Sequence, residues 1–132
     1  DRRLMKLLLD THTFIWWDSE PERLTQQVLG MIENPKNVLL VSMASLWEMQ
    51  IKLQLGKLKL NTPLEELVKG QLEINMIDIL EIKLEHILAL GKMPSHHKDP
   101  FDRLIIAQAG IEEAIVVTKD KMFSEYAIKV VW

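Results

Sequence analysis

The sequence predicts an α/β fold in which helices cover both faces of a central, mainly parallel sheet. Short continuous apolar runs at residues 6–9, 38–41 and 115–117 are typical of strands that are buried on both faces. Segments with apolar residues at helical spacing separate these runs, and strands that alternate with helices favour a parallel sheet. The 132 residues, 48% of them hydrophobic, are enough for one packed domain, which we expect to span residues 5–132.

The elements follow one another without a repeat or a linker. After the first strand we expect a helix over residues 22–33, which Asn34-Pro35 ends. In chain order, the later expected elements are a strand (38–41), a helix (45–55), a helix (63–73), a strand (76–79), a helix (84–90), a polar loop (95–98), a helix (99–114), a strand (115–117), a short helix (120–126) and a last strand (129–131).

The composition narrows the class of protein. The chain has no cysteine, which excludes disulfides and thiolate metal sites and is in keeping with a cytoplasmic protein. No apolar run approaches the roughly 20 residues that span a bilayer, and the run Leu7-Leu8-Leu9 is too short for a signal peptide. Met5 is one candidate start, which would make residues 1–4 upstream residues. The formal net charge of −3 does not indicate a basic face for nucleic acid.

Three of four candidate carboxylates lie where predicted strands lead into helices. Asp10 directly follows the first strand, Glu48 lies on the helix after the second strand, and Asp120 follows the strand at residues 115–117. These junctions share one edge of a parallel sheet, and Asp102 can join them if its helix begins there. Clustered carboxylates repel one another unless a cation neutralises them. The pattern therefore indicates a site for a hard divalent ion, which could activate water against a phosphodiester.

Each acid also has a simpler interpretation. Asp10 and Asp120 could cap the helices that follow them. Glu48 could pair with Lys52, four residues further along the helix. Asp99 precedes Pro100 and is the better helix cap, which leaves Asp102 free to act as a metal ligand.

Other polar candidates are weaker. His96 and His97 do not favour a zinc site, because adjacent side chains diverge and no third soft ligand is near. Ser42 and Ser45 are not part of a Gly-x-Ser-x-Gly elbow, and there is no glycine-rich phosphate loop.

Four stretches of the chain carry a family resemblance. They are MKLLLDTHTFIWW (residues 5–17), SMASLWE (42–48) continuing through Ile51-Lys52 and LGKL (55–58), DPFDRLIIAQA (99–109) and TKD (118–120). In this order they resemble the PIN-domain family, specifically the VapC-type toxins of bacterial toxin–antitoxin pairs. The resemblance implies a three-layer α/β/α fold and a Mg²⁺- or Mn²⁺-dependent ribonuclease of the cytoplasm.

The resemblance also implies roles for particular residues. Its acidic residues match Asp10, Glu48, Asp102 and Asp120. The first and third acids are the firmest metal ligands in the family, and the fourth varies most. Residues that resemble supporting positions near the site are Thr11, Ser42, Asp99, Arg103 and Thr118.

The partners implied by the resemblance are an RNA substrate, a cognate antitoxin and a second copy of the chain in a homodimer. Apolar residues in and after the helix at residues 45–55 are more than one core-facing stripe needs, so some could form a groove for an amphipathic partner segment. They could equally all belong to the core. These residues are Leu46, Trp47, Ile51, Leu53, Leu55, Leu58 and Leu60.

Two other functions fit parts of the pattern. A receiver-like signalling domain would use Asp10 as a phosphoacceptor, but it should have an adjacent acid where Thr11 stands and a lysine that ends the last strand. A non-catalytic PIN-like binding module would keep the fold and only bind a partner, yet such a copy should have lost some of the four acids.

Overall fold

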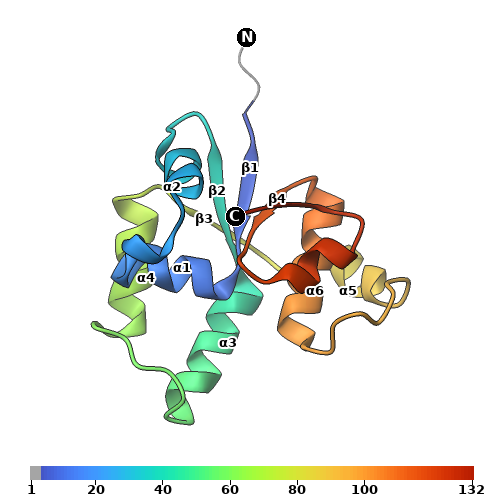
Figure 1. Ribbon diagram of the computed structural model, residues 1–132. Coiled ribbons are helices and arrows are strands. Elements are labelled where there is room, and N and C mark those ends of the chain that lie inside the picture. The colour runs from blue at the N-terminus through green and yellow to red at the C-terminus, as the bar shows by residue number, and fades with distance from the viewer. Residues whose placement is uncertain (1–3) are drawn as a thin grey trace.

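The computed structural model describes residues 4–132 and contains one sheet of five parallel strands. The strands are β1 (Lys6–Leu9), β2 (Val38–Ser42), β3 (Asp78–Leu80), β4 (Ile115–Val117) and β5 (Lys129–Val131). Their order across the sheet is β3-β2-β1-β4-β5, and every neighbouring pair is parallel. The predicted sheet is thus confirmed, with β1 at its centre (Figure 1).

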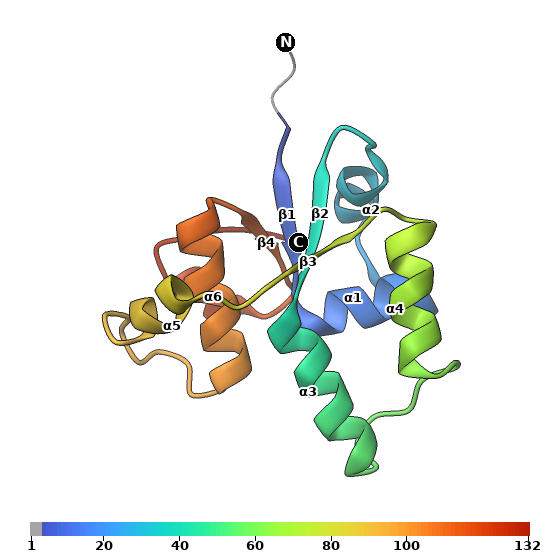
Figure 2. The ribbon, with the colours of Figure 1, turned by 180° about the vertical axis from the view of Figure 1, so that it is seen from behind.

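Helices cover both faces of this sheet. They are α1 (Thr11–Ser19), α2 (Gln26–Glu33), α3 (Met43–Gln54), α4 (Leu64–Glu73), α5 (Leu84–Leu90) and α6 (Pro100–Glu112), with short 3₁₀ helices η1 (Pro21–Arg23) and η2 (Lys121–Glu125). The views from front and back agree that α1, α2 and α4 lie on one side and α5 and α6 on the other (Figures 1 and 2). The arrangement is the expected three-layer α/β/α fold.

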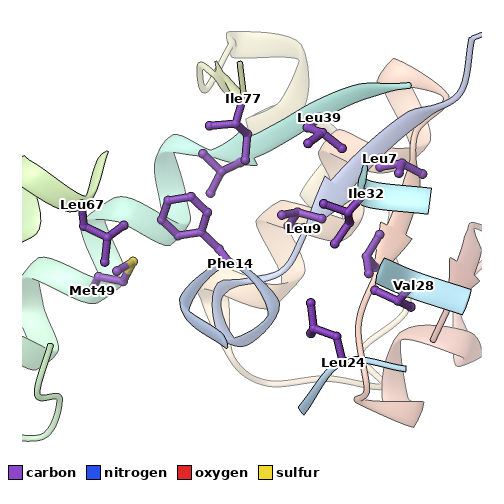
Figure 3. Close-up of a cluster of buried hydrophobic side chains, with 12 residues drawn as sticks. Leu7, Leu9, Phe14, Leu24, Val28, Ile32, Leu39, Met49, Leu67 and Ile77 are labelled. Carbon is purple, nitrogen blue, oxygen red and sulfur yellow. The ribbon is translucent and has the colours of Figure 1, made fainter. Parts of the chain in front are cut away.

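The central strand divides the apolar core into two layers. Leu7 and Leu9 point to one face, and Leu8 points to the other, because side chains alternate along a strand. All three are fully buried. Leu7 and Leu9 pack with Phe14 of α1 and with side chains from α2, α3 and α4 (Figure 3). Leu8 packs with Ile105 of α6 in the second cluster. Core packing therefore fixes β1 on both of its faces, and Asp10 directly follows this fixed strand.

Several boundaries differ from the sequence expectation. The helix α1 was not predicted, because its apolar residues are consecutive rather than at helical spacing. Asp10 starts it by accepting the Thr13 N–H. The helix predicted from residue 22 begins only after Thr25, whose hydroxyl accepts the Val28 N–H. The strand predicted at residues 76–79 is shifted to Asp78–Leu80, and the short helix after Asp120 is a 3₁₀ helix.

None of the helices in residues 4–132 has both the length and the apolar content needed to cross a bilayer.

Candidate metal centre

The predicted acids gather at the carboxyl edge of the sheet. Because all strands run the same way, β1, β2 and β4 end at this edge and lead into α1, α3 and η2. Hydrogen bonds tie the ends of β1 and β4 together. The Asp10 N–H donates to the Val117 carbonyl at 3.1 Å, and the Thr13 hydroxyl donates to the same oxygen at 2.9 Å.

Asp10 is a buried carboxylate with only neutral donors around it. The residue is only 5% exposed to solvent. Oδ1 accepts the Thr13 N–H at 2.9 Å, and Oδ2 accepts the Thr118 hydroxyl at 2.6 Å. Burial raises the pKa of Asp10 above its ordinary value. Within residues 4–132, no lysine or arginine forms an ion pair with it.

Glu48 reaches the site from α3 and is almost as deeply buried, at 4% exposure. The Thr11 hydroxyl donates to its Oε1 at 2.7 Å, and Lys52 Nζ donates to its Oε2 at 2.6 Å. The simple pairing with Lys52 is therefore real, and this hydrogen bond raises the pKa of Lys52. Thr11 directly follows Asp10, so its hydroxyl also connects the start of α1, next to Asp10, with Glu48.

Asp102 lies in the first turn of α6, where Asp99 caps the helix as expected. Oδ1 of Asp99 accepts the N–H groups of Phe101 at 2.8 Å and Asp102 at 3.2 Å. Burial, followed by the charges of nearby carboxylates, raises the pKa of Asp102 to about 8. Those carboxylates are Asp99, Glu48, Asp10 and Asp120. Asp102 therefore lies close enough to the other three predicted acids for their charges to act on it.

Asp120 meets Asp102 through a histidine, His97, that the sequence pattern did not predict as part of the site. Oδ1 of Asp120 caps η2 by accepting the Met122 N–H at 2.9 Å. His97 Nε2 lies 3.0 Å from Asp102 Oδ2 and 3.4 Å from Asp120 Oδ2. One potential ligand atom from each of the three residues lies within 4.8 Å of the others. The adjacent pair His96-His97 did not indicate this position in the sequence, because the course of the loop between α5 and α6, and not a local pattern, places His97 beside the acids.

The predicted supporting residues take different positions. Thr118 joins two acids, because its hydroxyl donates to Asp10 and accepts the Asp120 N–H at 3.0 Å. Ser42 caps α3 and donates to Gln108 Oε1 at 2.6 Å, so its hydroxyl is directed to α6 rather than to an acid.

Arg103 is directed to the loop before α6. Nη1 donates to the carbonyls of Pro94 at 2.9 Å and His97 at 3.4 Å, and Nη2 donates to the carbonyl of Leu90 at 3.3 Å. Among the residues that the structure describes, it forms no ion pair with a carboxylate. Its contacts hold the segment that carries His97 against the start of α6.

The site residues fit a hard divalent cation. The four acids offer carboxylate oxygens, the ligands that Mg²⁺ and Mn²⁺ prefer. Two of them are buried, and Lys52 forms an ion pair with only one of the four, Glu48. A divalent ion would offset the remaining negative charge. Fold and site together define an α/β/α protein with a carboxylate centre at the carboxyl edge of a parallel sheet.

The chain belongs to the PIN domain family, whose pattern matches residues 7–129. A relative in Mycobacterium tuberculosis, Ribonuclease VapC22, is 31% identical over 126 residues, which cover 87% of each protein. The resemblance inferred from the four sequence stretches is thus confirmed.

Solved structures show the same fold. In VapBC2 from Rickettsia felis, bound to a promoter DNA fragment, a chain superposes with a TM-score of 0.73 at 18% identity, over 96% of this chain and 98% of that one. DNA-bound VapBC from Salmonella typhimurium gives 0.70 at 19% identity, over 97% and 98%. At these identities the likeness concerns the fold alone.

Proposed function

We propose that this protein is a metal-dependent endoribonuclease and the toxin of a toxin–antitoxin pair. The observation that carries the proposal is the convergence of Asp10, Glu48, Asp102 and Asp120 at one sheet edge of a PIN domain. The relative named Ribonuclease VapC22 supports RNA as the substrate. The proposed reaction is hydrolysis of a phosphodiester bond.

In this proposal Asp10 and Asp102 hold Mg²⁺ or Mn²⁺, and Glu48 and Asp120 complete the ligand set or orient the attacking water. Bound there, the ion would lower the pKa of a water molecule and neutralise charge on the phosphate oxygens. Thr11 and Thr118 keep the carboxylates oriented through their hydroxyl hydrogen bonds. Lys52 is more than one-third exposed beside Glu48, so its ammonium group could meet an approaching phosphate.

We also propose an antitoxin partner and a homodimer. Several of the apolar residues in and after α3 are not core residues, since Trp47 is 58% exposed and Leu55 is 62% exposed. Leu46, Leu58 and Leu60 instead pack against the core. The solved structures that share this fold are named VapBC2 and VapBC, which supports a protein partner for an exposed apolar surface. Co-expression with the product of the adjacent gene, followed by size-exclusion chromatography, tests this assignment.

The central test replaces ligands without changing their shape. Asp10→Asn and Asp102→Asn should each lower metal-dependent RNA cleavage at least about a hundredfold, the loss expected when a charge-stabilising group is removed. Asp78→Asn is the matched control, because Asp78 is an exposed residue at the start of β3. Wild-type rates in both site variants would refute the proposed centre. RNA-end mapping with Mg²⁺ and with a chelator then identifies the bond that is cut.

A further inference from the structure

His97 lies in the loop between α5 and α6 and is held from several sides. Its backbone N–H donates to the Tyr126 hydroxyl at 2.7 Å, and its carbonyl accepts from Arg103. Its ring meets Phe123 edge-on, with the ring centres 5.9 Å apart. The side chain is only 15% exposed. These contacts fix the imidazole against the acids rather than leaving it free in solvent.

The contacts of the two ring nitrogens assign the direction of the hydrogen bonds. Nδ1 accepts the Asp99 N–H at 3.3 Å, so the ring hydrogen is on Nε2. Nε2–H then donates to Asp120 Oδ2 at 3.4 Å, and Asp102 Oδ2 lies 3.0 Å from the same nitrogen. A histidine that binds a metal through one nitrogen normally donates a hydrogen bond from the other. The polarity at His97 is the reverse, which is the arrangement of a donor and not of a ligand.

We propose that His97 is a positioning residue that clamps Asp120 to Asp102, so that both carboxylates face the same ion. The inference deepens the proposed function and rests on it. Asp120 needs such a clamp because its side chain is 41% exposed and lies at the N-terminal cap of a short 3₁₀ helix. In the described part of the chain, His97 is the donor that contacts Oδ2 of Asp120.

Both acids keep lone pairs for a cation, because each carboxylate oxygen has two. On Asp120 both oxygens already have one partner, the Met122 N–H at Oδ1 and His97 at Oδ2. His97 contacts Oδ2 of Asp102, and the other carboxylate oxygen, Oδ1, stays available to a cation. Hydrogen bonds that orient ligating carboxylates typically change metal affinity or activity by about 10- to 100-fold when they are lost. His97 should therefore act on metal affinity without touching the metal.

The test compares two amides at position 97. In His97→Gln the side-chain amide nitrogen can reach the place of Nε2 and still donate to the acids. In His97→Asn the shorter amide can replace Nδ1 beside Asp99 but has no donor at the place of Nε2. Calorimetric titration with Mn²⁺ should show affinity at least about tenfold weaker in His97→Asn, and at least partly recovered in His97→Gln.

A matched control and a spectroscopic measurement complete the design. His96→Asn changes the exposed neighbour, which meets the Tyr126 ring edge-on, and should keep wild-type affinity. Electron spin-echo spectroscopy of the Mn²⁺-loaded wild type should show no directly bound nitrogen. A bound histidine nitrogen, unchanged or tighter affinity in His97→Asn, or a His97→Gln variant no better than His97→Asn would each overturn the clamp.

The outcome is separable from that of the proposed function. A wild-type protein that binds Mn²⁺ and cuts RNA, with His97→Asn equally able to bind, defeats only the role of His97. A wild-type protein that neither binds Mn²⁺ nor cuts RNA defeats the nuclease assignment itself.

Discussion

At the scale of single residues, the carboxyl group of Asp102 couples the site to pH. Its pKa is raised from 3.8 to about 8 in the folded protein, chiefly by burial and then by neighbouring carboxylates. Between these two values the folded state holds more protons than the unfolded state. The free energy of unfolding should therefore fall as pH rises from about 4 to 8. The raised pKa of Asp10 acts in the same direction.

This effect gives a prediction for the metal-free protein. Asp102→Asn cannot ionise, so it should be more stable than the wild type at pH 8 and should gain little at pH 5. Urea denaturation in a chelator at both values measures the difference. Because the two proteins differ only at position 102, the comparison isolates the aspartate. If the free energy of unfolding changed with pH equally in the two proteins, the pKa of Asp102 would not be raised in the folded state.

The sequence patterns predicted that the acids gather at one edge of the sheet, and they also predicted several of the local contacts of these acids. Asp10 and Asp120 are helix caps as well as members of the acidic cluster, since one oxygen of each accepts a backbone N–H. The other oxygen contacts the Thr118 hydroxyl in Asp10 and His97 in Asp120. Glu48 likewise pairs with Lys52 and contacts Thr11 at once. The simple interpretation of each acid therefore does not exclude the functional one. His97 could not be found from sequence, because its neighbours Asp102 and Asp120 are brought to it by tertiary structure.

At the scale of elements, Gln108 fastens α6 to the sheet. It is fully buried, its Oε1 accepts the Ser42 hydroxyl at the end of β2, and its Nε2 donates to the Glu81 carbonyl at 3.2 Å. Asp102 lies on the same helix, so this attachment helps to set its position.

Gln108→Leu should lower the free energy of unfolding by about 1–3 kcal/mol, because the hydroxyl of Ser42 and the carbonyl of Glu81 would lose a buried partner. Urea denaturation gives the value. The control Gln27→Leu changes an exposed glutamine on α2 and should stay within about 0.5 kcal/mol of the wild type. A Gln108 variant as stable as this control would show that the buried amide does not hold the helix.

Elements were predictable where the pattern was simple. The apolar runs of β1, β2 and β4 identified the middle of the sheet, because strands buried on both faces need no polar alternation. Pro100 and the cap at Asp99 fixed the start of α6. By contrast, α1 packs Phe14 into the core but carries Trp16 and Trp17 at partly exposed positions, so its sequence lacks a clear apolar stripe. Tertiary packing, rather than local periodicity, determines that helix.

At the scale of the whole molecule, metal binding should stabilise the fold, because the ion would offset the repulsion among the gathered acids. A ligand at a hundred times its dissociation constant adds about 2.7 kcal/mol to stability when it binds only the folded state. Mg²⁺ or Mn²⁺ should therefore raise the melting temperature of the wild type. Asp10→Asn should lose most of that rise, and Asp78→Asn should keep it. Thermal melts with the ion and with a chelator decide the matter; an equal rise in Asp10→Asn would contradict a centre built on Asp10.

The adjacency of β1 and β4 has a consequence for protein synthesis. The centre of the sheet pairs the first strand with a strand made more than a hundred residues later, and Asp10 depends on Val117 and Thr118 for two of its hydrogen bonds. A growing chain on the ribosome thus carries the first acid long before the groups that orient it. Fragments that stop before β4 cannot assemble the acidic edge. The proposed nuclease should therefore stay inactive toward the RNA of the ribosome that is translating it until almost all of its sequence has been made.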